Sequence, residues 1–205
     1  NPDDYFGQKP VKRETGEPKD VKDNVVKLPT RNRQADEDQK DPVLEEIETL
    51  AKPRTKLNKG LNELYRADAG FSPKQFLSGA NMAYEMIVNA FADGDHQSLK
   101  NLLSREVYEG FKNAIDERQS RGDVVKSSFV GIDDSEIKSA EIREQEAQIS
   151  VRFESQIVSV TFDKDGKVID GDENEVARVS DIWTFARDLR SNDPNWKLVA
   201  TEAEG

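Results

Sequence analysis

Cysteine is absent from the 205-residue sequence, and histidine occurs only once, as His96. Without cysteine the chain can form no disulfide, no thiolate metal site and no thiol nucleophile. Hydrophobic residues make up 35% of the chain, which is little for one compact globule of this length. We therefore expect part of the chain to be solvated. No apolar run approaches the ~18 residues of a membrane-spanning helix.

Positive charge is scarcer than negative charge. The formal net charge is −11 at pH 7, and no basic stripe interleaved with aromatic residues is present, so no nucleic-acid partner is expected. The sequence contains no P-loop, GxGxxG, GxSxG or HExxH motif. His96 lies where a helix is expected to begin, which favours a solvated or capping role over catalysis. We therefore predict no catalytic residue, no metal site and no cofactor.

Residues 1–41 differ in composition from the rest of the chain. They are rich in proline, lysine, aspartate and asparagine, and they show no sustained hydrophobic period. We predict a disordered linker here. Because the chain begins at Asn1 rather than at methionine, we also expect it to be a fragment whose upstream segment, including any membrane anchor, has been removed.

An amphipathic helical arm is predicted for residues 42–69. Asp41 resembles an N-cap followed by proline, and Pro53 must end or kink the helix that follows it. A second helical stripe consists of Leu57, Leu61, Leu64 and Tyr65. The basic residues around the break are Lys52, Arg54, Lys56 and Lys59. Either the arm packs on its own domain with these basic side chains in solvent, or it lies on anionic lipid or grips a partner.

Three further helices are predicted before Gly122. Ser72, Pro73 and Gln75 form a capping-box signature, and apolar residues then recur at helical spacing as far as Ala92. The face of this main helix comprises Phe76, Leu77, Ala80, Ala83, Tyr84, Ile87, Val88 and Phe91. A short helix is predicted over residues 96–103. Ser104 caps the next helix, whose face comprises Val107, Tyr108, Phe111, Ala114 and Ile115.

Beyond Gly122 the hydrophobic period becomes two, which indicates strands. We predict strands over residues 124–132 and 136–142, and a longer one from Gln148 to Phe162. In the longer strand the apolar positions change from odd to even numbers near residues 155–157. This change of phase predicts a β-bulge that curls the sheet. Residues 164–167 carry a hairpin-turn signal.

Residues 176–201 contain both tryptophans of the chain, Trp183 and Trp196. The residues that alternate onto one face are Val179, Asp181, Trp183, Phe185 and Arg187. A turn over residues 189–194 and renewed alternation from Trp196 complete a predicted β-hairpin that forms the floor of the core. The competing interpretation is a helix, whose face would be Val179, Ile182, Trp183 and Ala186. We favour the hairpin because β-branched and aromatic residues dominate.

Helices followed by antiparallel strands, without βαβ alternation, predict an α+β fold with the helices on one face of a curved, bulged sheet. A curved sheet wrapped over a long helix leaves a concave apolar face, so an apolar pocket is expected. The predicted lining residues are Phe76, Tyr84, Ile87, Tyr108, Phe111, Trp183 and Phe185.

Asp181 is the acid that the pattern places on this apolar face. A buried carboxylate with a raised pKa could act as a general base, with Tyr84 or Tyr108 as its partner. Alternatively, Asp181 pairs with Arg178 or Arg187 and has a structural role. The acidic segments 163–166 and 170–172 lack the spacing of a calcium loop, and we predict turns there.

Six short segments, in this order and spacing, resemble a known family. They are FSPKQFL (71–77), AFADGD (90–95), LKNLLS (99–104), VRFES (151–155), DIWTFARD (181–188) and NWKLV (195–199). Together they resemble the C-terminal domain of the forty-four-kilodalton peripheral subunit of the mitochondrial inner-membrane presequence translocase. The resemblance is stronger to its short alphaproteobacterial, adaptor-like members, and it covers about residues 43–202.

The resemblance implies a strongly curved, cone-like sheet, similar to the nuclear-transport-factor-two superfamily, with a large apolar pocket. It also implies that the first helices of the domain contact cardiolipin-containing membrane. That role would fall on Lys52, Arg54, Lys56, Leu57, Lys59, Leu61 and Leu64. The long region expected to tether a chaperone motor in the mitochondrial members is missing here, so motor function is not expected.

Two functions therefore remain open. The first is a non-enzymatic adaptor or scaffold of the bacterial inner membrane. In it, residues 1–41 form a tether, 42–69 an arm and 70–205 a docking domain. Its partners would be an anionic phospholipid membrane and inner-membrane proteins, on the cytoplasmic side in preference to the periplasmic side. The alternative is a small-molecule binding protein or isomerase-type enzyme that uses the cone pocket and Asp181.

Overall fold

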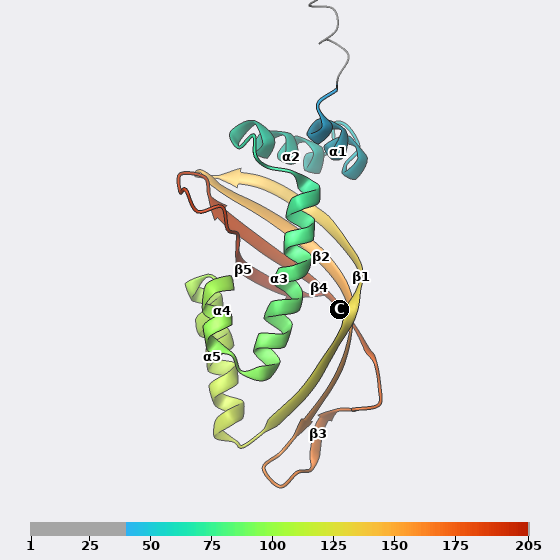
Figure 1. Cartoon of the computed structure of the whole chain (residues 1–205), viewed down its shortest axis with the longest axis vertical. Helices are drawn as coiled ribbons and strands as arrows, with labels where there is room; N and C mark the ends of the chain where they lie inside the picture. Colours follow the sequence, from blue (N-terminus) through green and yellow to red (C-terminus); the bar gives the residue numbers. More distant parts are fainter. Residues whose placement is uncertain (1–39, 205) are drawn as a thin grey trace, which may run out of the picture. The chain divides into compact units, whose positions relative to one another are not determined.

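The computed structural model describes residues 40–204, so the predicted linker lies outside the described residues except for its last two positions. The described residues fall into one compact unit, Lys40–Gly205. Within it, helices α1 to α5 precede strands β1 to β5 (Figure 1). The predicted order of helices and then antiparallel strands is confirmed.

Helix α3 (Pro73–Asp93) runs along the concave side of the sheet, and the residues at its two ends explain its limits. The Ser72 hydroxyl accepts a hydrogen bond from the backbone N–H of Gln75, and proline occupies the first turn. Gly94 ends the helix in the left-handed region with φ 70°. The buried face consists of Pro73, Phe76, Ala80, Tyr84, Ile87 and Ala90. The predicted main helix is confirmed.

The starting points of the other four helices are also fixed by capping side chains. These helices are α1 (Pro42–Leu50), α2 (Lys56–Ala67), α4 (His96–Leu102) and α5 (Arg105–Ser120). The side chain before each helix accepts a hydrogen bond from the first turn, and the four capping residues are Asp41, Thr55, Asp95 and Ser104. The predicted caps Asp41 and Ser104 are confirmed, as is Gly122 just after the end of α5.

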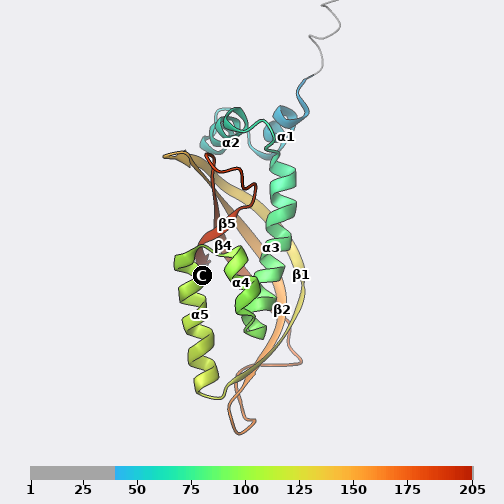
Figure 2. The same cartoon turned by 60° about the vertical axis from the view of Figure 1, so that its left-hand side comes forward.

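The strands form one antiparallel sheet in the order β1-β2-β4-β5. They are β1 (Val124–Arg143), β2 (Glu146–Phe162), β3 (Val168–Gly171), β4 (Ala177–Asp188) and β5 (Lys197–Ala203). Strand β3 pairs with the end of β2 through the predicted turn at residues 164–167. The sheet is curved, and α3, α4 and α5 lie on its concave side (Figures 1 and 2). The α+β class is therefore confirmed.

Two details of the strands correct the sequence prediction. Residues 124–132 and 136–142 belong to one strand of 20 residues, β1, rather than to two. The extra residues at its register shifts are Val130, Asp133 and Lys138, all in β1. The bulges therefore lie in β1, opposite residues 154–157 and 150–151 of β2, whose pairing with β4 from Glu146 to Ile157 is uninterrupted. The sequence correctly predicted a bulged sheet but placed the bulge in β2, because a bulge depends on the pairing partner, which a single strand does not reveal.

The C-terminal residues form the predicted hairpin, and the helical interpretation is wrong. Strand β4 pairs with β5, so that Trp183 faces Thr201 across the hairpin and Val151 on β2. The Tyr84 ring of α3 lies 4.4 Å from the Trp183 ring and 4.4 Å from the stacked Phe153 ring. Such aromatic pairs contribute about 0.5–1.5 kcal/mol each beyond the area they bury. This cluster joins α3 to the middle of the sheet.

Candidate functional site

Helix α2 packs directly onto the sheet, and α1 packs against α2 and α3, so the two helices do not stand away as an arm. A Cβ atom on Gly60 would lie 1.8 Å from the carbonyl oxygen of Ala140, so α2 and β1 are in backbone contact. Leu61 and Leu64 are 0% and 1% exposed. The sequence proposed both leucines as lipid-binding residues, but they are covered by the domain's own core. Leu57 is half-buried against the same core.

Polar contacts fix these two helices to the rest of the domain. Arg187 of β4 donates from Nη1 to Asp68 Oδ2 at 2.7 Å, at the C-cap of α2. This hydrogen bond from Arg187 holds the pKa of Asp68 below its usual value. The Tyr65 hydroxyl donates to Asp41 at 2.6 Å, and the Ser72 hydroxyl donates to Glu46 at 2.8 Å. These contacts join α1, α2, α3 and β4 into one rigid end.

The basic residues of this end point into solvent. Lys52, Arg54, Lys56 and Lys59 are all exposed, and none of them forms an ion pair within residues 40–204. Two apolar side chains of α1 are also exposed, Leu44 at 40% and Leu50 at 39%. They are spaced on α1 at three residues from Ile47, which is the buried residue of this helix. We call these four basic residues and two leucines the α1–α2 surface.

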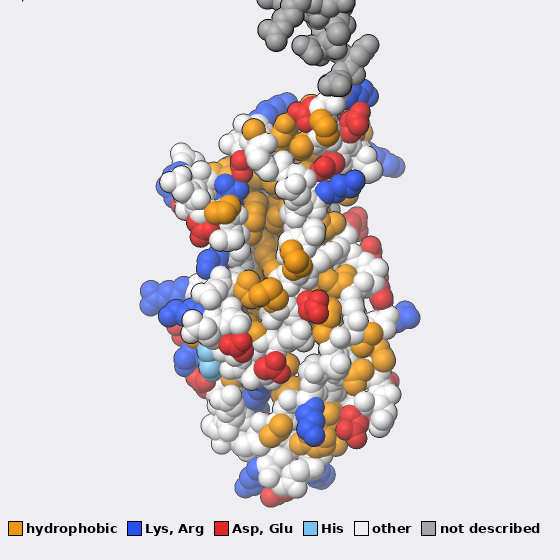
Figure 3. All heavy atoms as spheres, in the orientation of Figure 1, with side chains coloured by type: hydrophobic (Ala, Val, Ile, Leu, Met, Phe, Trp, Pro, Cys, Tyr) orange, Lys and Arg blue, Asp and Glu red, His pale blue; other side chains and the backbone are white. Residues whose placement is uncertain are grey.

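A groove of about 490 Å³ lies between α3, the α2–α3 connection and the β4–β5 loop, and hydrophobic side chains line a hollow on this face (Figure 3). Its lining includes Phe71, Phe76, Ala80, Met82, Met86, Phe185 and Trp196. Of the predicted pocket residues, only Phe76 and Phe185 line it. Sequence analysis missed the two methionines, whose i,i+4 spacing on α3 was the available signal.

The other predicted lining residues do not face this groove. Tyr84, Ile87 and Trp183 are buried in the core, because α3 itself fills the concave side of the sheet at this level. Tyr108 and Phe111 are half-buried on α5. The predicted set is therefore split between the groove, the core and α5.

Asp181 contacts one of the two tyrosines proposed as its partner. The Tyr84 hydroxyl donates to Asp181 Oδ2 at 3.2 Å and lies 2.9 Å from the Ser155 hydroxyl. Burial raises the pKa of Asp181 above its ordinary value. The hydrogen bond from Tyr84 lowers this pKa, but its effect is smaller than that of burial. Burial also raises the pKa of Tyr84 to about 12. Neither proposed arginine pairs with Asp181: Arg187 is bound to Asp68, and Arg178 forms no ion pair within residues 40–204.

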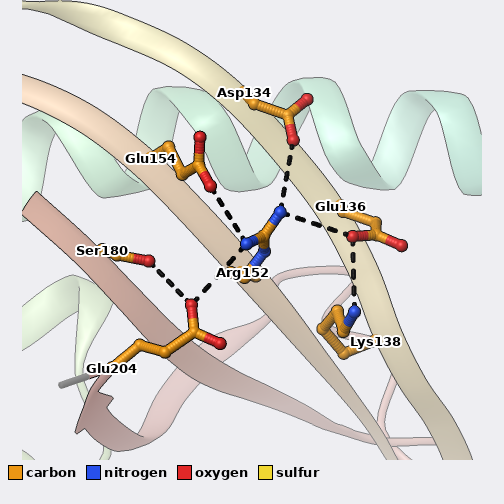
Figure 4. A network of polar contacts seen from close by, with 7 residues as sticks. All are labelled: Asp134, Glu136, Lys138, Arg152, Glu154, Ser180 and Glu204. Atoms are coloured by element: carbon orange, nitrogen blue, oxygen red, sulfur yellow. Dashed lines mark hydrogen bonds and ion pairs between the residues drawn. The ribbon is translucent and has the colours of Figure 1, made fainter.

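The remaining polar candidates have structural contacts. His96 Nε2 lies 3.5 Å from Asp116 Oδ1 on α5. In the turn at 163–167, Asp163 accepts from the backbone N–H groups of Asp165 and Lys167. On the convex side of the sheet, Arg152 is surrounded by carboxylates (Figure 4). These carboxylates are Asp134, Glu136, Glu154 and Glu204.

Within residues 40–204 no cluster of three or more potential metal ligands occurs. In the same part of the chain, none of the helices combines the length and apolar character that crossing a bilayer requires.

Comparison with known proteins identifies relatives of this chain. The chain is 26% identical over 161 residues to the probable mitochondrial import inner membrane translocase subunit tin-44 of Caenorhabditis elegans, covering 77% of this chain and 38% of that protein. It is 25% identical over 153 residues to human mitochondrial import inner membrane translocase subunit TIM44, covering 73% and 34%. The uncharacterized protein RP434 of Rickettsia prowazekii is 25% identical over 143 residues, covering 70% and 58%. The chain thus spans little more than a third of the two translocase subunits.

Among solved structures, the intermembrane space region of chloroplast protein ARC6 aligns with a TM-score of 0.43 at 11% identity, covering 62% of this chain and 95% of that one. The family model described as the Tim44-like domain matches residues 57–203, which include α2 to α5 and the whole sheet. The chain therefore belongs to the Tim44-like domain family.

Proposed function

We propose that this chain is a non-enzymatic adaptor that docks on an anionic phospholipid membrane through the α1–α2 surface. The observation that carries the proposal is the set of four exposed basic side chains without ion-pair partners in the described residues, in a protein of net charge −11. Exposed Leu44 and Leu50 supply apolar contacts beside them. Because α1 and α2 are fixed to the sheet, docking there would orient the whole domain.

The relatives support the location that we propose. Two of them are named as subunits of a mitochondrial import inner membrane translocase, and a third comes from the bacterium Rickettsia prowazekii. By analogy we place this chain at a bacterial inner membrane, on its cytoplasmic side, with an inner-membrane protein as a second partner. The groove beside α3 is a candidate surface for that partner, because exposed methionines such as Met82 and Met86 suit adaptable apolar contacts.

The charge of the surface is sufficient for reversible binding. Each Lys or Arg held near an anionic surface contributes about 1 kcal/mol. Four such residues contribute about 4 kcal/mol, or about three orders of magnitude in partitioning. The attraction falls with ionic strength because its range is the Debye length. Glu45 and Glu48 are also exposed on α1, so the positive charge concentrates at the α1–α2 connection and the start of α2.

The test is co-sedimentation of the full chain with cardiolipin-rich vesicles and with neutral vesicles. We expect binding to cardiolipin-rich vesicles only, weakened by salt and by the triple variant Lys52→Glu, Lys56→Glu, Lys59→Glu. A matched control reverses three exposed lysines elsewhere: Lys100, Lys164 and Lys167. It changes the net charge equally and should bind nearly as well as the wild type. Equal loss in both triple variants would mean that net charge alone governs binding, and salt-insensitive binding or no binding would contradict the proposal.

Point variants are preferable to a truncation that begins at Gly70. Such a truncation would remove Ile47, Leu61 and Leu64, which are at most 1% exposed, and would uncover the apolar end of the sheet. Loss of binding could then reflect loss of folding. Leu50→Ser instead tests apolar insertion at an exposed site, and it should reduce binding to cardiolipin-rich vesicles without changing the salt dependence.

The second candidate function is small-molecule binding, and the apolar groove beside α3 favours it. Isomerase-type catalysis would need a substrate atom within hydrogen-bond reach of the Asp181 carboxylate. Asp181 does not line the groove beside α3. Binding is therefore better supported than catalysis.

A further inference from the structure

A second hollow, of about 320 Å³, lies between the C-terminal half of α3, the end of α5 and strands β1, β2 and β4. Its walls are apolar with a few small hydroxyl groups. The lining residues include Val88, Phe91, Arg118, Ile157, Ser159 and Val179. A volume of this size is at the lower end of small-molecule sites. We call it the sheet cavity.

Arg118 is the charged residue in this lining, and its guanidinium is already engaged. Its Nη2 atom donates to the carbonyl oxygens of Phe91 and Ala92 at 2.6 and 2.7 Å, which satisfies the end of α3. The guanidinium carbon also lies 5.2 Å from the centre of the Phe91 ring. Arg118 thus puts a fixed positive charge at the end of the cavity nearest to the C-terminus of α3.

A polar group of three hydrogen-bonded side chains, Tyr84, Ser155 and Asp181, borders the cavity toward the middle of the sheet. Each member of this group lies one step along its own element from a lining residue. Tyr84 lies one helical turn before Val88 on α3. Ser155 precedes Ile157 by two residues on the same face of β2, and Asp181 follows Val179 by two residues on β4. Ser155 also pairs directly with Val179. Three independent elements therefore place the polar group beside the cavity.

The hydrogen bonds of this group leave one carboxylate oxygen, Asp181 Oδ1, without a donor in the described residues. The Tyr84 hydroxyl has a single proton, which it gives to Asp181 Oδ2, so the Ser155 hydroxyl donates to Tyr84. Asp181 Oδ1 has no hydrogen-bond donor within residues 40–204, and no Lys, Arg or His of that range forms an ion pair with Asp181. The carboxylate is half-buried, and the ring of Tyr84, which donates to it, packs on the Trp183 ring. A half-buried carboxylate without a cation is complementary to a ligand that brings one.

We propose that the sheet cavity binds a small amphiphilic monoamine, with its apolar body between Val88 and Val179 and its ammonium group on Asp181. An alkyl chain suits the valine and isoleucine walls. The ammonium group supplies both the positive charge and the donors that Asp181 Oδ1 lacks. Two residues of a strand span about 6.8 Å, so a ligand centred at Val179 reaches Asp181 with a short chain. The positive charge of Arg118 disfavours a second ammonium group at the opposite end.

The experiment uses the full chain and three probes of equal chain length: octylamine, 1-octanol and 1,8-diaminooctane. Binding is followed by isothermal titration calorimetry and by the fluorescence of the tryptophans, one of which, Trp183, packs on Tyr84. We expect octylamine to bind at least tenfold more tightly than 1-octanol or the diamine. Equal affinities for the three probes, or no saturable binding of octylamine, would overturn the proposal.

Two variants separate the roles of charge and space. Asp181→Asn keeps an acceptor for Tyr84 but removes the charge, so octylamine should bind at least tenfold more weakly while 1-octanol binding is unchanged. Val179→Phe fills the cavity without changing Asp181, and both ligands should bind more weakly. Both variants are checked for cooperative thermal unfolding. Unchanged octylamine binding in either folded variant, or equal loss of both ligands in Asp181→Asn, would contradict the proposed site.

Discussion

Gly60 of α2 lies against the backbone carbonyl of Ala140 on β1. A Cβ atom added to Gly60 would lie 1.8 Å from that oxygen and 2.7 Å from the carbonyl carbon. Neither atom belongs to a flexible side chain, so the helix or the strand would have to move. This contact shows why an otherwise unfavourable glycine occupies the interior of a twelve-residue helix. It also makes α2 a structural part of the domain.

We predict that Gly60→Ala destabilises the protein despite the higher helix propensity of alanine. The expected net loss is about 1–2 kcal/mol, because so close a contact puts the overpacking cost at about 3 kcal/mol, against roughly 1 kcal/mol gained in propensity. Gly110→Ala on α5 is the matched control, since nothing lies within 4 Å of its added Cβ, and it should be neutral or stabilising. Urea denaturation of both variants is the measurement. Equal stabilities would mean that α2 does not pack on β1 in solution.

The ion pair between Asp68 and Arg187 should make the attachment of α2 sensitive to pH. Asp68→Asn should cost about 1 kcal/mol at pH 7, because the pair is partly buried at 26% and 18% side-chain exposure. Arg187 lowers the pKa of Asp68, so the stabilisation is present above the ordinary aspartate pKa and is lost as pH falls through the lower folded value. Denaturation of wild type and variant at pH 7 and pH 2.5 measures this. A stability difference that persists undiminished at pH 2.5 would contradict it.

The helices were predictable because their signals are local. Ser72, Ser104 and Asp41 are caps whose hydrogen bonds extend only two or three residues, and each was identified from neighbouring residues alone. The C-terminal hairpin was likewise predictable from alternation and a short turn. In both cases the residues that decide the structure are adjacent in the chain.

Features that depend on a distant partner were not predictable. The polar run at residues 133–135 resembles a break, but β2 pairs alongside it and Gln156 donates to the Asp133 carboxylate, so β1 continues. Leu61 and Leu64 form an apolar stripe that would suit lipid equally well, and only the packing against β1 decides that they are buried. The predicted pocket was divided for the same reason, because the position of α3 is a tertiary property.

Arg152 should have a larger effect on stability than its location on the convex face suggests. Its Nη1 atom lies 3.0 Å from Glu154 and 3.7 Å from Glu204, and its Nη2 atom lies 3.7 Å from both Asp134 and Glu136. Arg152→Met leaves Glu136 paired with Lys138 and removes the ion-pair partner of the other three carboxylates, so we expect a loss of about 1–2 kcal/mol at pH 7 and low salt.

The same loss should shrink in high salt, which screens the repulsion among the carboxylates. Arg190→Met is the control, because Arg190 is 67% exposed and pairs with Asp188 alone, and it should change stability by less than about 0.5 kcal/mol. Thermal unfolding at two salt concentrations tests both variants. A salt-independent loss in Arg152→Met would indicate that the packing of its aliphatic stem dominates instead.

Asp181→Asn should stabilise the protein at neutral pH, in contrast to most substitutions of half-buried residues. Burial raises the pKa of Asp181 in the folded state, so the native protein binds this proton more tightly than the unfolded chain does. The ionised carboxylate therefore costs stability above the raised pKa, and this cost disappears as pH falls to the ordinary aspartate value of about 3.9. Asparagine avoids the cost and still accepts from Tyr84.

The difference in free energy of unfolding between Asp181→Asn and wild type should consequently be largest near pH 7 and vanish near pH 3.5. Ser155→Ala is a useful comparison, because it removes the proton that the Ser155 hydroxyl donates to Tyr84 without removing charge. It should destabilise the protein by about 1 kcal/mol at every pH. Chemical denaturation of the three proteins across this range is the measurement. If Asp181→Asn is less stable than wild type at pH 7, a cation compensates the carboxylate in solution and the unpaired state inferred for Asp181 is wrong.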